Sequence, residues 1–127
     1  LYKLGRGRKL PVKNFIMSSE IVVGVGNIYA AESLFRAGIR PDRSAGRISL
    51  KRYIALSQHI KAVLRTAIEQ GGTTLRDFVD SVGDPGYFKQ QLKVYGRHGS
   101  PCTVCKAPLK LKRLGQRSTV FCSRCQT

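Results

Sequence analysis

The sequence of 127 residues is strongly basic, with 23 lysines and arginines against 7 aspartates and glutamates. Its formal net charge of +16 exceeds what solubility requires and favours a polyanionic partner, of which the phosphate backbone of a nucleic acid is the natural one. An anionic membrane is a poor second, because the longest apolar run, residues 21–25, is interrupted by Gly24. A chain of this length can bury one small core.

In chain order, residues 1–9 show no hydrophobic periodicity, and we expect a flexible lead-in there. A short first helix is predicted to begin at Pro11, since proline suits a first helical turn and three apolar residues follow at helical spacing before Ser18. Asn27 is a good N-cap for a second helix, which is predicted to end at Gly38.

The glycines before this second helix form a candidate anion site. Gly24 and Gly26 let the backbone approach a ligand closely, and the unpaired amides of a helix that starts at Asn27 favour a phosphate. A plain turn between packed helices is the alternative. The dinucleotide-binding fingerprint is excluded, because Tyr29 stands where that motif requires glycine.

Ser49 precedes a long amphipathic segment that ends at Gly71–Gly72 and is the best candidate core element. Its expected buried face comprises Leu50, Tyr53, Ile54, Ser57, Ile60, Leu64, Ala67 and Ile68. Residues 73–86 are polar and contain glycines, which predicts a long loop of a kind that is often functional. Helical spacing then returns until Gly96 at Tyr87, Phe88, Gln91, Leu92 and Tyr95.

Two Cys-x-x-Cys pairs, separated by sixteen residues, use every cysteine of the chain. These cysteines are Cys102, Cys105, Cys122 and Cys125. Such pairs can bring four thiolates to one tetrahedral Zn²⁺; two disulfides are the alternative, which a basic chain without a secretory or membrane segment disfavours. Alternating apolar and basic residues around Gly115–Gln116 predict a β-hairpin between the pairs. The expected fold class is mainly α, followed by a zinc-clamped hairpin finger with one structural ion.

Arg117 follows the predicted turn at the tip of this finger, where an arginine can enter a minor groove or bridge phosphates. A solvated cation is the alternative for any single arginine in so basic a segment. His98 lies close to Cys102 in the sequence, but four thiolates already complete a structural site. We therefore expect His98 to be exposed or to face phosphate.

Four segments occur in a specific combination: residues 13–17 (KNFIM), 22–32 (VVGVGNIYAAE), 71–78 (GGTTLRDF) and 94–97 (VYGR). Together with the cysteine pairs they closely resemble the C-terminal half of the formamidopyrimidine-DNA glycosylase family. The resemblance covers essentially the whole chain. It implies a helix-two-turn-helix DNA-binding domain over residues 1–96 and a four-cysteine zinc finger over residues 97–127. The endonuclease VIII branch is similar at the glycine turn and the finger, but residues 71–78 look like the purine-lesion branch.

The resemblance implies a bacterial base-excision repair enzyme of the cytoplasm, associated with the nucleoid and acting as a monomer. Such an enzyme removes 8-oxoguanine and formamidopyrimidines from double-stranded DNA and cleaves the abasic strand by β,δ-elimination. The residues implied to hold DNA around a flipped nucleotide are Lys13, Gly26, Asn27, Tyr95 and Arg117. The loop implied to close over the everted base contains Thr73, Thr74, Arg76 and Tyr87.

In this family the nucleophile is the secondary amine of an N-terminal proline beside a catalytic glutamate, and this sequence does not begin with that pair. Pro11 cannot substitute, because its nitrogen is tied up in an amide. We therefore expect the chain to bind DNA without glycosylase activity by itself. Two other interpretations stay open: a zinc-ribbon module that binds structured RNA, and a basic scaffold without substrate preference.

Overall fold

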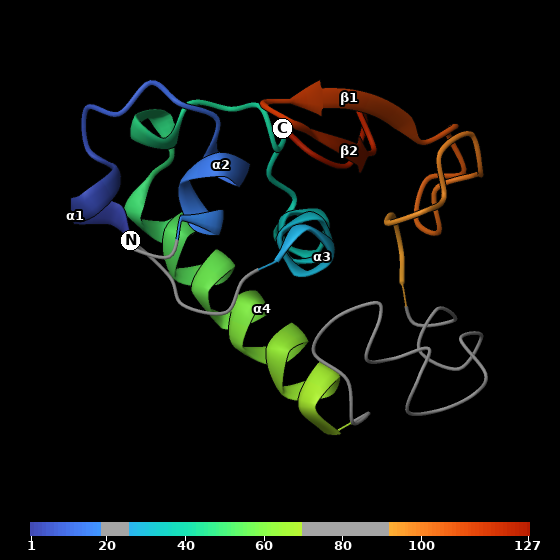
Figure 1. Ribbon diagram of the computed structural model, residues 1–127, viewed down its shortest axis with the longest axis horizontal. Coiled ribbons are helices and arrows are strands. Elements are labelled where there is room, and N and C mark those ends of the chain that lie inside the picture. Colours follow the sequence, from blue (N-terminus) through green and yellow to red (C-terminus); the bar gives the residue numbers. More distant parts are fainter. Residues whose placement is uncertain (19–25, 70–91) are drawn as a thin grey trace.

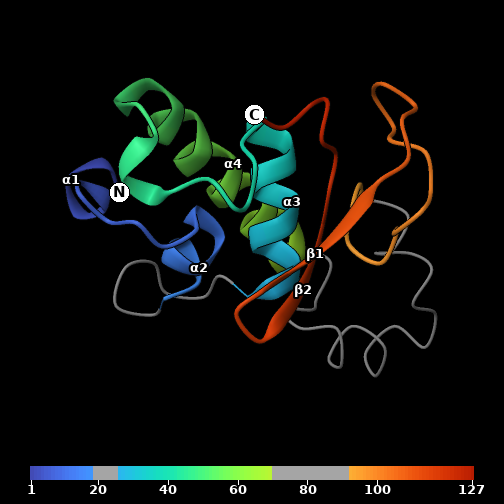
Figure 2. The ribbon, with the colours of Figure 1, turned by 90° about the horizontal axis from the view of Figure 1, so that it is seen from above.

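The computed structural model describes residues 1–18, 26–69 and 92–127. Its elements are α1 (Tyr2–Gly5), α2 (Val12–Met17), α3 (Asn27–Ala37), the 3-10 turn η1 (Ala45–Arg47), α4 (Leu50–Glu69), β1 (Lys110–Leu114) and β2 (Arg117–Phe121). Helix α3 occupies the centre, with the other helices on one side and the β1–β2 hairpin on the other (Figures 1 and 2). No helix in the described part of the chain is long and apolar enough to cross a membrane.

Helix α3 is buried on both of its sides because it lies between the other helices and the hairpin. Every residue from Ile28 to Phe35 is buried. One side packs against α2 and α4 in the main core, and the other contributes Ala31 and Phe35 to a second cluster beside the cysteines. The helix ends as predicted at Gly38, whose φ of 72° is left-handed and therefore suits glycine.

The flexible lead-in predicted for residues 1–9 is wrong. Residues 2–5 form α1, and the ring of Tyr2 packs edge-on against that of Tyr53, with 6.3 Å between the ring centroids. Gly5 is buried, and a Cβ atom there would lie 2.7 Å from the Tyr53 hydroxyl oxygen. A single helical turn shows no periodicity, so its contacts with distant residues could not be inferred from its own sequence.

Helix α4 has the predicted start but a rotated buried face. The Ser49 hydroxyl accepts a hydrogen bond from the Arg52 amide at 3.3 Å, so Ser49 caps the start of the helix. The fully described buried residues of the helix are Tyr53, Leu56, Ile60 and Val63. Leu50 and Ile54, which the sequence placed in the core, are each 52% exposed. Helix α4 carries apolar residues on two overlapping stripes, so its own sequence does not decide which stripe is buried. Packing against α2 and α3 decides it.

The helix predicted to end before Gly96 is not formed in its described part. Leu92 and Tyr95 lie in an irregular segment, and residues 87–91 lie outside the described residues. The amides of this segment bond to the carboxylate of Glu32 on α3 instead of to helical carbonyls. A side chain that is distant in sequence has therefore replaced the local hydrogen-bonding pattern.

The predicted hairpin is confirmed. Strands β1 and β2 are antiparallel, Leu114 pairs with Arg117, and the chain turns at Gly115–Gln116. Gly115 has a φ of 64°, which a two-residue hairpin turn favours and glycine adopts without strain.

Side-chain contacts fix this hairpin against the helices. Asp42 accepts hydrogen bonds from Arg40 Nε at 3.0 Å and from Lys112 Nζ of β1 at 2.8 Å. The hydrogen bond from Arg40, and to a smaller extent that from Lys112, lowers the pKa of the Asp42 carboxyl to about 2. The Arg40 guanidinium also lies over the ring of Phe121 in β2, 4.9 Å from its centroid.

The end of the chain provides a second attachment. The buried Gln126 side chain accepts a hydrogen bond from the Cys122 amide at 2.8 Å and donates one to the Ile39 carbonyl at 2.9 Å. The Thr127 amide donates to the Gly38 carbonyl at 3.0 Å. The finger is therefore held in a defined orientation beside the C-terminal end of α3.

Candidate metal centre and nucleic-acid interface

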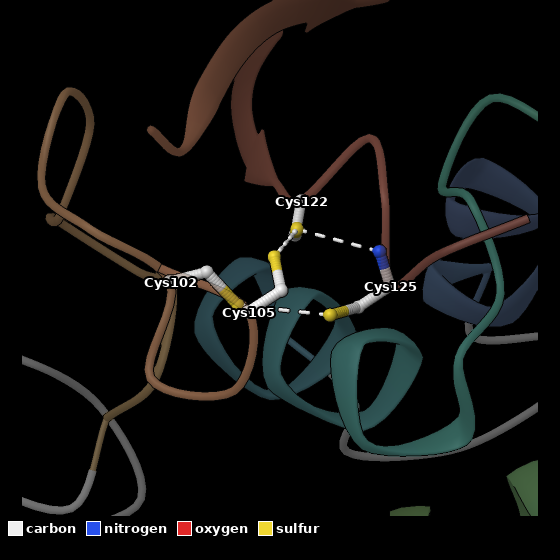
Figure 3. A group of neighbouring side chains, drawn as sticks. All are labelled: Cys102, Cys105, Cys122 and Cys125. Atoms are coloured by element: carbon white, nitrogen blue, oxygen red, sulfur yellow. Dashed lines mark hydrogen bonds between the residues drawn. The ribbon is translucent and has the colours of Figure 1, made fainter. Parts of the chain in front are cut away.

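The four cysteines converge at the base of the hairpin (Figure 3). Their sulfur atoms all lie within 4.8 Å of one another; Cys102 and Cys125 are 3.8 Å apart, and Cys105 and Cys122 are 3.4 Å apart. Four sulfurs at Zn–S distances of roughly 2.3 Å in a tetrahedron would be separated by about 3.8 Å. The donor set and its spacing therefore fit one Zn²⁺, and the cysteines are free, not disulfide-bonded.

The surroundings of the cluster are those of a closed structural site. The amide of Val104 donates to the Cys102 sulfur and that of Cys125 to the Cys122 sulfur, each at 3.4 Å. Cys102 and Cys122 are completely buried, beside Phe35 of α3. Four thiolates leave no open position for catalysis, so the protein has one structural zinc site at these cysteines. As predicted, His98 is exposed, and it is not part of the described cluster.

A basic pocket of about 240 Å³ lies where α2 meets the tip of the hairpin. Lys13 reaches it from α2 and Arg117 from the start of β2. Its remaining lining residues are Asn14, Met17, Ser18, Leu114 and Gln116. Two cations from opposite ends of the sequence thus share one opening of a size that accommodates a phosphate group.

Lys13 is the most perturbed cation of this pocket. It is only 1% exposed, and its Nζ donates a hydrogen bond to Thr119 Oγ1 of β2 at 2.5 Å. Burial, and then the nearby positive charge of Arg117, lower the pKa of Lys13 to about 8. No described carboxylate pairs with this ammonium group. An anionic ligand would supply the missing counter-charge.

Asn27 lies at the same junction but does not cap α3 as predicted. Gly26 takes the N-cap position, with an extended backbone, and its carbonyl accepts the amide of Ala30 at 2.9 Å. The Asn27 side chain instead extends toward β2, where its Nδ2 lies 3.5 Å from the Ser118 carbonyl oxygen. Its buried Oδ1 has no hydrogen-bond partner. The helix start and the hairpin tip are therefore adjacent, which sequence distance concealed.

The structure thus brings Lys13, Gly26, Asn27 and Arg117 to one junction. Tyr95 is separate from the residues that line the pocket; it is half-buried and packs against the helical core. Thr73, Thr74, Arg76 and Tyr87 lie outside the described residues. Sequence reasoning missed Asn14 and Gln116, which line the pocket, and Thr119, which accepts the hydrogen bond from Lys13; their only signal was their proximity in sequence to Lys13 and Arg117.

Comparisons with known proteins agree with this architecture. The family model described as the formamidopyrimidine-DNA glycosylase H2TH domain matches residues 2–79, and the zinc finger found in FPG and IleRS matches residues 99–127. Curated formamidopyrimidine-DNA glycosylases of Syntrophotalea carbinolica and Methylococcus capsulatus are each 62% identical over 126 residues, covering 99% of this chain and 46% of the relative. The chain therefore spans about half the length of these relatives.

Solved structures give the same result. MutM (FPG) from Thermus thermophilus is 36% identical with a TM-score of 0.86, over 98% of this chain and 48% of that one. Lactococcus lactis Fpg in complex with abasic-site DNA is 28% identical with a TM-score of 0.86, over 99% of this chain and 45% of that one.

The fold and the site together define a helix-two-turn-helix domain with an attached four-cysteine zinc finger. The predicted module class is thereby confirmed. The chain belongs to the formamidopyrimidine-DNA glycosylase family. Neither an RNA-binding zinc ribbon nor an endonuclease VIII branch is favoured by these matches.

Proposed function

We infer that this chain is the DNA-binding half of a bifunctional base-excision repair enzyme. The enzyme would be a DNA glycosylase and abasic-site lyase acting on 8-oxoguanine and formamidopyrimidine lesions in double-stranded DNA. The observation that carries this proposal is the basic pocket shared by Lys13 and Arg117 beside Asn27. Its support from relatives is a solved Lactococcus lactis Fpg bound to abasic-site DNA.

In the proposed complex a phosphate of the DNA backbone enters the pocket. Lys13 provides a fixed ammonium group, Arg117 a planar guanidinium with several donors, and the Asn27 amide a neutral donor. The pocket is partly shielded from water, so these charges act more strongly on a phosphate than fully exposed cations would. Zinc contributes by holding the hairpin tip, and hence Arg117, opposite α2.

The same proposal includes the other site residues and the domain organisation expected from the sequence. Tyr95 contacts a further phosphate, and the loop containing Thr73, Thr74, Arg76 and Tyr87 closes over an everted base. The mainly α fold class, the division at residues 96 and 97, the monomeric state and the location in the bacterial cytoplasm with the nucleoid are likewise proposals. They rest on the family resemblance.

Fluorescence anisotropy with three ligands at two salt concentrations tests the proposal. The ligands are an undamaged duplex, a matched duplex with a stable abasic-site analogue, and a structured RNA. We expect tighter binding to duplex DNA than to RNA, with affinity that falls as salt increases. Tighter binding to the RNA would overturn the proposal. A preference for the abasic duplex would show that this chain recognises the distorted strand unaided.

Arg117→Ala provides the site-specific arm of this experiment. Loss of one phosphate contact should weaken duplex binding and reduce the slope of log affinity against log salt by about one. Arg65→Ala is the matched control, because Arg65 is exposed on α4 and carries the same charge. Equal effects of the two substitutions would show that Arg117 is only one more solvated cation.

A further inference from the structure

Glu32 is a buried carboxylate on α3 that the basic pocket and the zinc site do not use. Its side chain is 1% exposed. Oε1 accepts a hydrogen bond from the Lys93 amide at 2.7 Å, and Oε2 accepts bonds from the amides of Val94 and Tyr95 at 2.9 and 2.8 Å. Three consecutive main-chain amides thus converge on one side chain, as they do in backbone nests that bind anions.

This arrangement satisfies groups that would otherwise be buried without partners. Residues 92–95 belong to no helix or strand, so their amides lack the usual ladder of carbonyl acceptors. A buried carboxylate in turn needs several donors to remain charged away from water. Each side of the contact therefore depends on the other.

The bonds to Glu32 fix the path of the chain between two hydrophobic clusters. Leu92 is 5% exposed and belongs to the helical core, whereas Val94 is fully buried in the cluster that contains Cys102. The Arg97 amide then donates to the Val94 carbonyl at 3.0 Å and turns the chain toward the first cysteine pair. Tyr95 belongs to this fixed segment and is half-buried, with its side chain packed against the helical core.

We propose that Glu32 is a positioning residue for DNA binding, whose carboxylate holds the amides of residues 93–95 so that the Tyr95 hydroxyl is presented to the phosphate backbone. The inference rests on the proposed function, in which Tyr95 contacts DNA. According to this inference, a negatively charged residue favours the binding of a polyanion. Simple electrostatics predicts the opposite effect, which makes the inference testable.

The first experiment compares Glu32→Gln with the unaltered chain in duplex-binding assays. The substitution removes one negative charge, so general electrostatics predicts unchanged or tighter binding. Glu32→Gln also directs an NH₂ group at the amide donors of residues 93–95. We expect it to weaken duplex binding by about three- to tenfold, because those amides lose their carboxylate acceptor. Tighter binding by Glu32→Gln would overturn the inference.

A double-mutant cycle asks whether Glu32 acts through Tyr95. In protein that already carries Tyr95→Phe, Glu32→Gln should have little further effect on affinity, whereas in protein that carries Arg117→Ala it should keep its full effect. Additive effects of Glu32→Gln and Tyr95→Phe would refute the positioning role and leave the proposed function standing. Failure of the unaltered chain to bind duplex DNA would refute both.

Two further measurements keep the test independent of folding defects. Each variant must bind one equivalent of zinc and keep its helical circular dichroism; if Glu32→Gln fails to fold, Glu32→Asp replaces it. The shorter carboxylate keeps the charge but cannot reach all three amides, so we again expect weaker binding, and unchanged affinity would count against the proposal. In the unaltered protein, the amides of residues 93–95 should exchange slowly with solvent; rapid exchange would contradict it directly.

Discussion

At the residue scale, Lys13 shows how distant elements determine the chemistry of one side chain. Its position on α2 buries the ammonium group, and β2 supplies both the Thr119 hydroxyl and the neighbouring charge of Arg117. The sequence identified Lys13 only through a family resemblance. Its own neighbours in the sequence gave no sign of the perturbed environment, because that environment is created by the docking of the hairpin.

Duplex affinity should depend on the protonation of Lys13. In the free protein burial and Arg117 lower its pKa to about 8, and a bound phosphate would raise that pKa because it stabilises the ammonium form. Binding is therefore coupled to proton uptake above that value, and affinity should fall as the pH rises through about 8. Anisotropy titrations between about pH 7 and about pH 9 measure this dependence directly.

Lys13→Met is the control, since it keeps much of the aliphatic stem and removes the titrating group. Its affinity should be lower than that of the unaltered chain and nearly independent of pH over the same range. A flat pH profile of affinity in the unaltered chain would contradict the role of Lys13.

The stability of the free protein should show the opposite trend. Between the lowered pKa of Lys13 in the folded protein and its normal pKa, the unfolded state binds more protons than the folded state, so stability should increase with pH in that range.

At the element scale, the sequence predicted helix existence better than helix contacts. The start of α2, the end of α3 and the turn of the hairpin follow from proline, glycine and alternation, which act locally. The ordered residues 2–5 and the irregular residues 92–95 were missed, because the first needs Tyr53 and the second needs Glu32. Both partners are distant in sequence, so local patterns carry no record of them.

The rotated face of α4 gives a direct prediction about stability. Leu56 is completely buried, whereas Ile54, on the face expected from the sequence, is 52% exposed. Leu56→Ala should lower the free energy of unfolding by about 2 to 5 kcal/mol, because it leaves a cavity against the core. Ile54→Ala should lower it by less than about 1 kcal/mol. Chemical denaturation of the two variants measures both values, and a larger loss for Ile54→Ala would show that the predicted face is the buried one.

At the scale of the whole molecule, the basic pocket exists only because the finger is docked on the helices. Its two cations belong to separate parts of the sequence, and their distance is set by the contacts of Asp42, Phe121 and Gln126 that hold the finger in place. The metal site was predictable from cysteine spacing alone. The pocket was not, because docking contacts between separate modules leave no periodic pattern in either one.

Removal of zinc should therefore separate DNA binding from helical structure. Four thiolates without a metal cannot hold the knuckles together, so a chelator should disorder the hairpin while α3 and α4 keep their circular dichroism. Duplex affinity should fall together with the order of the finger and return when zinc is added back. In zinc-free protein, Arg117→Ala should cause no further loss, because Arg117 is no longer held opposite Lys13. A zinc-free chain that binds duplex DNA with the original affinity and salt dependence would show instead that the helices bind DNA without the finger.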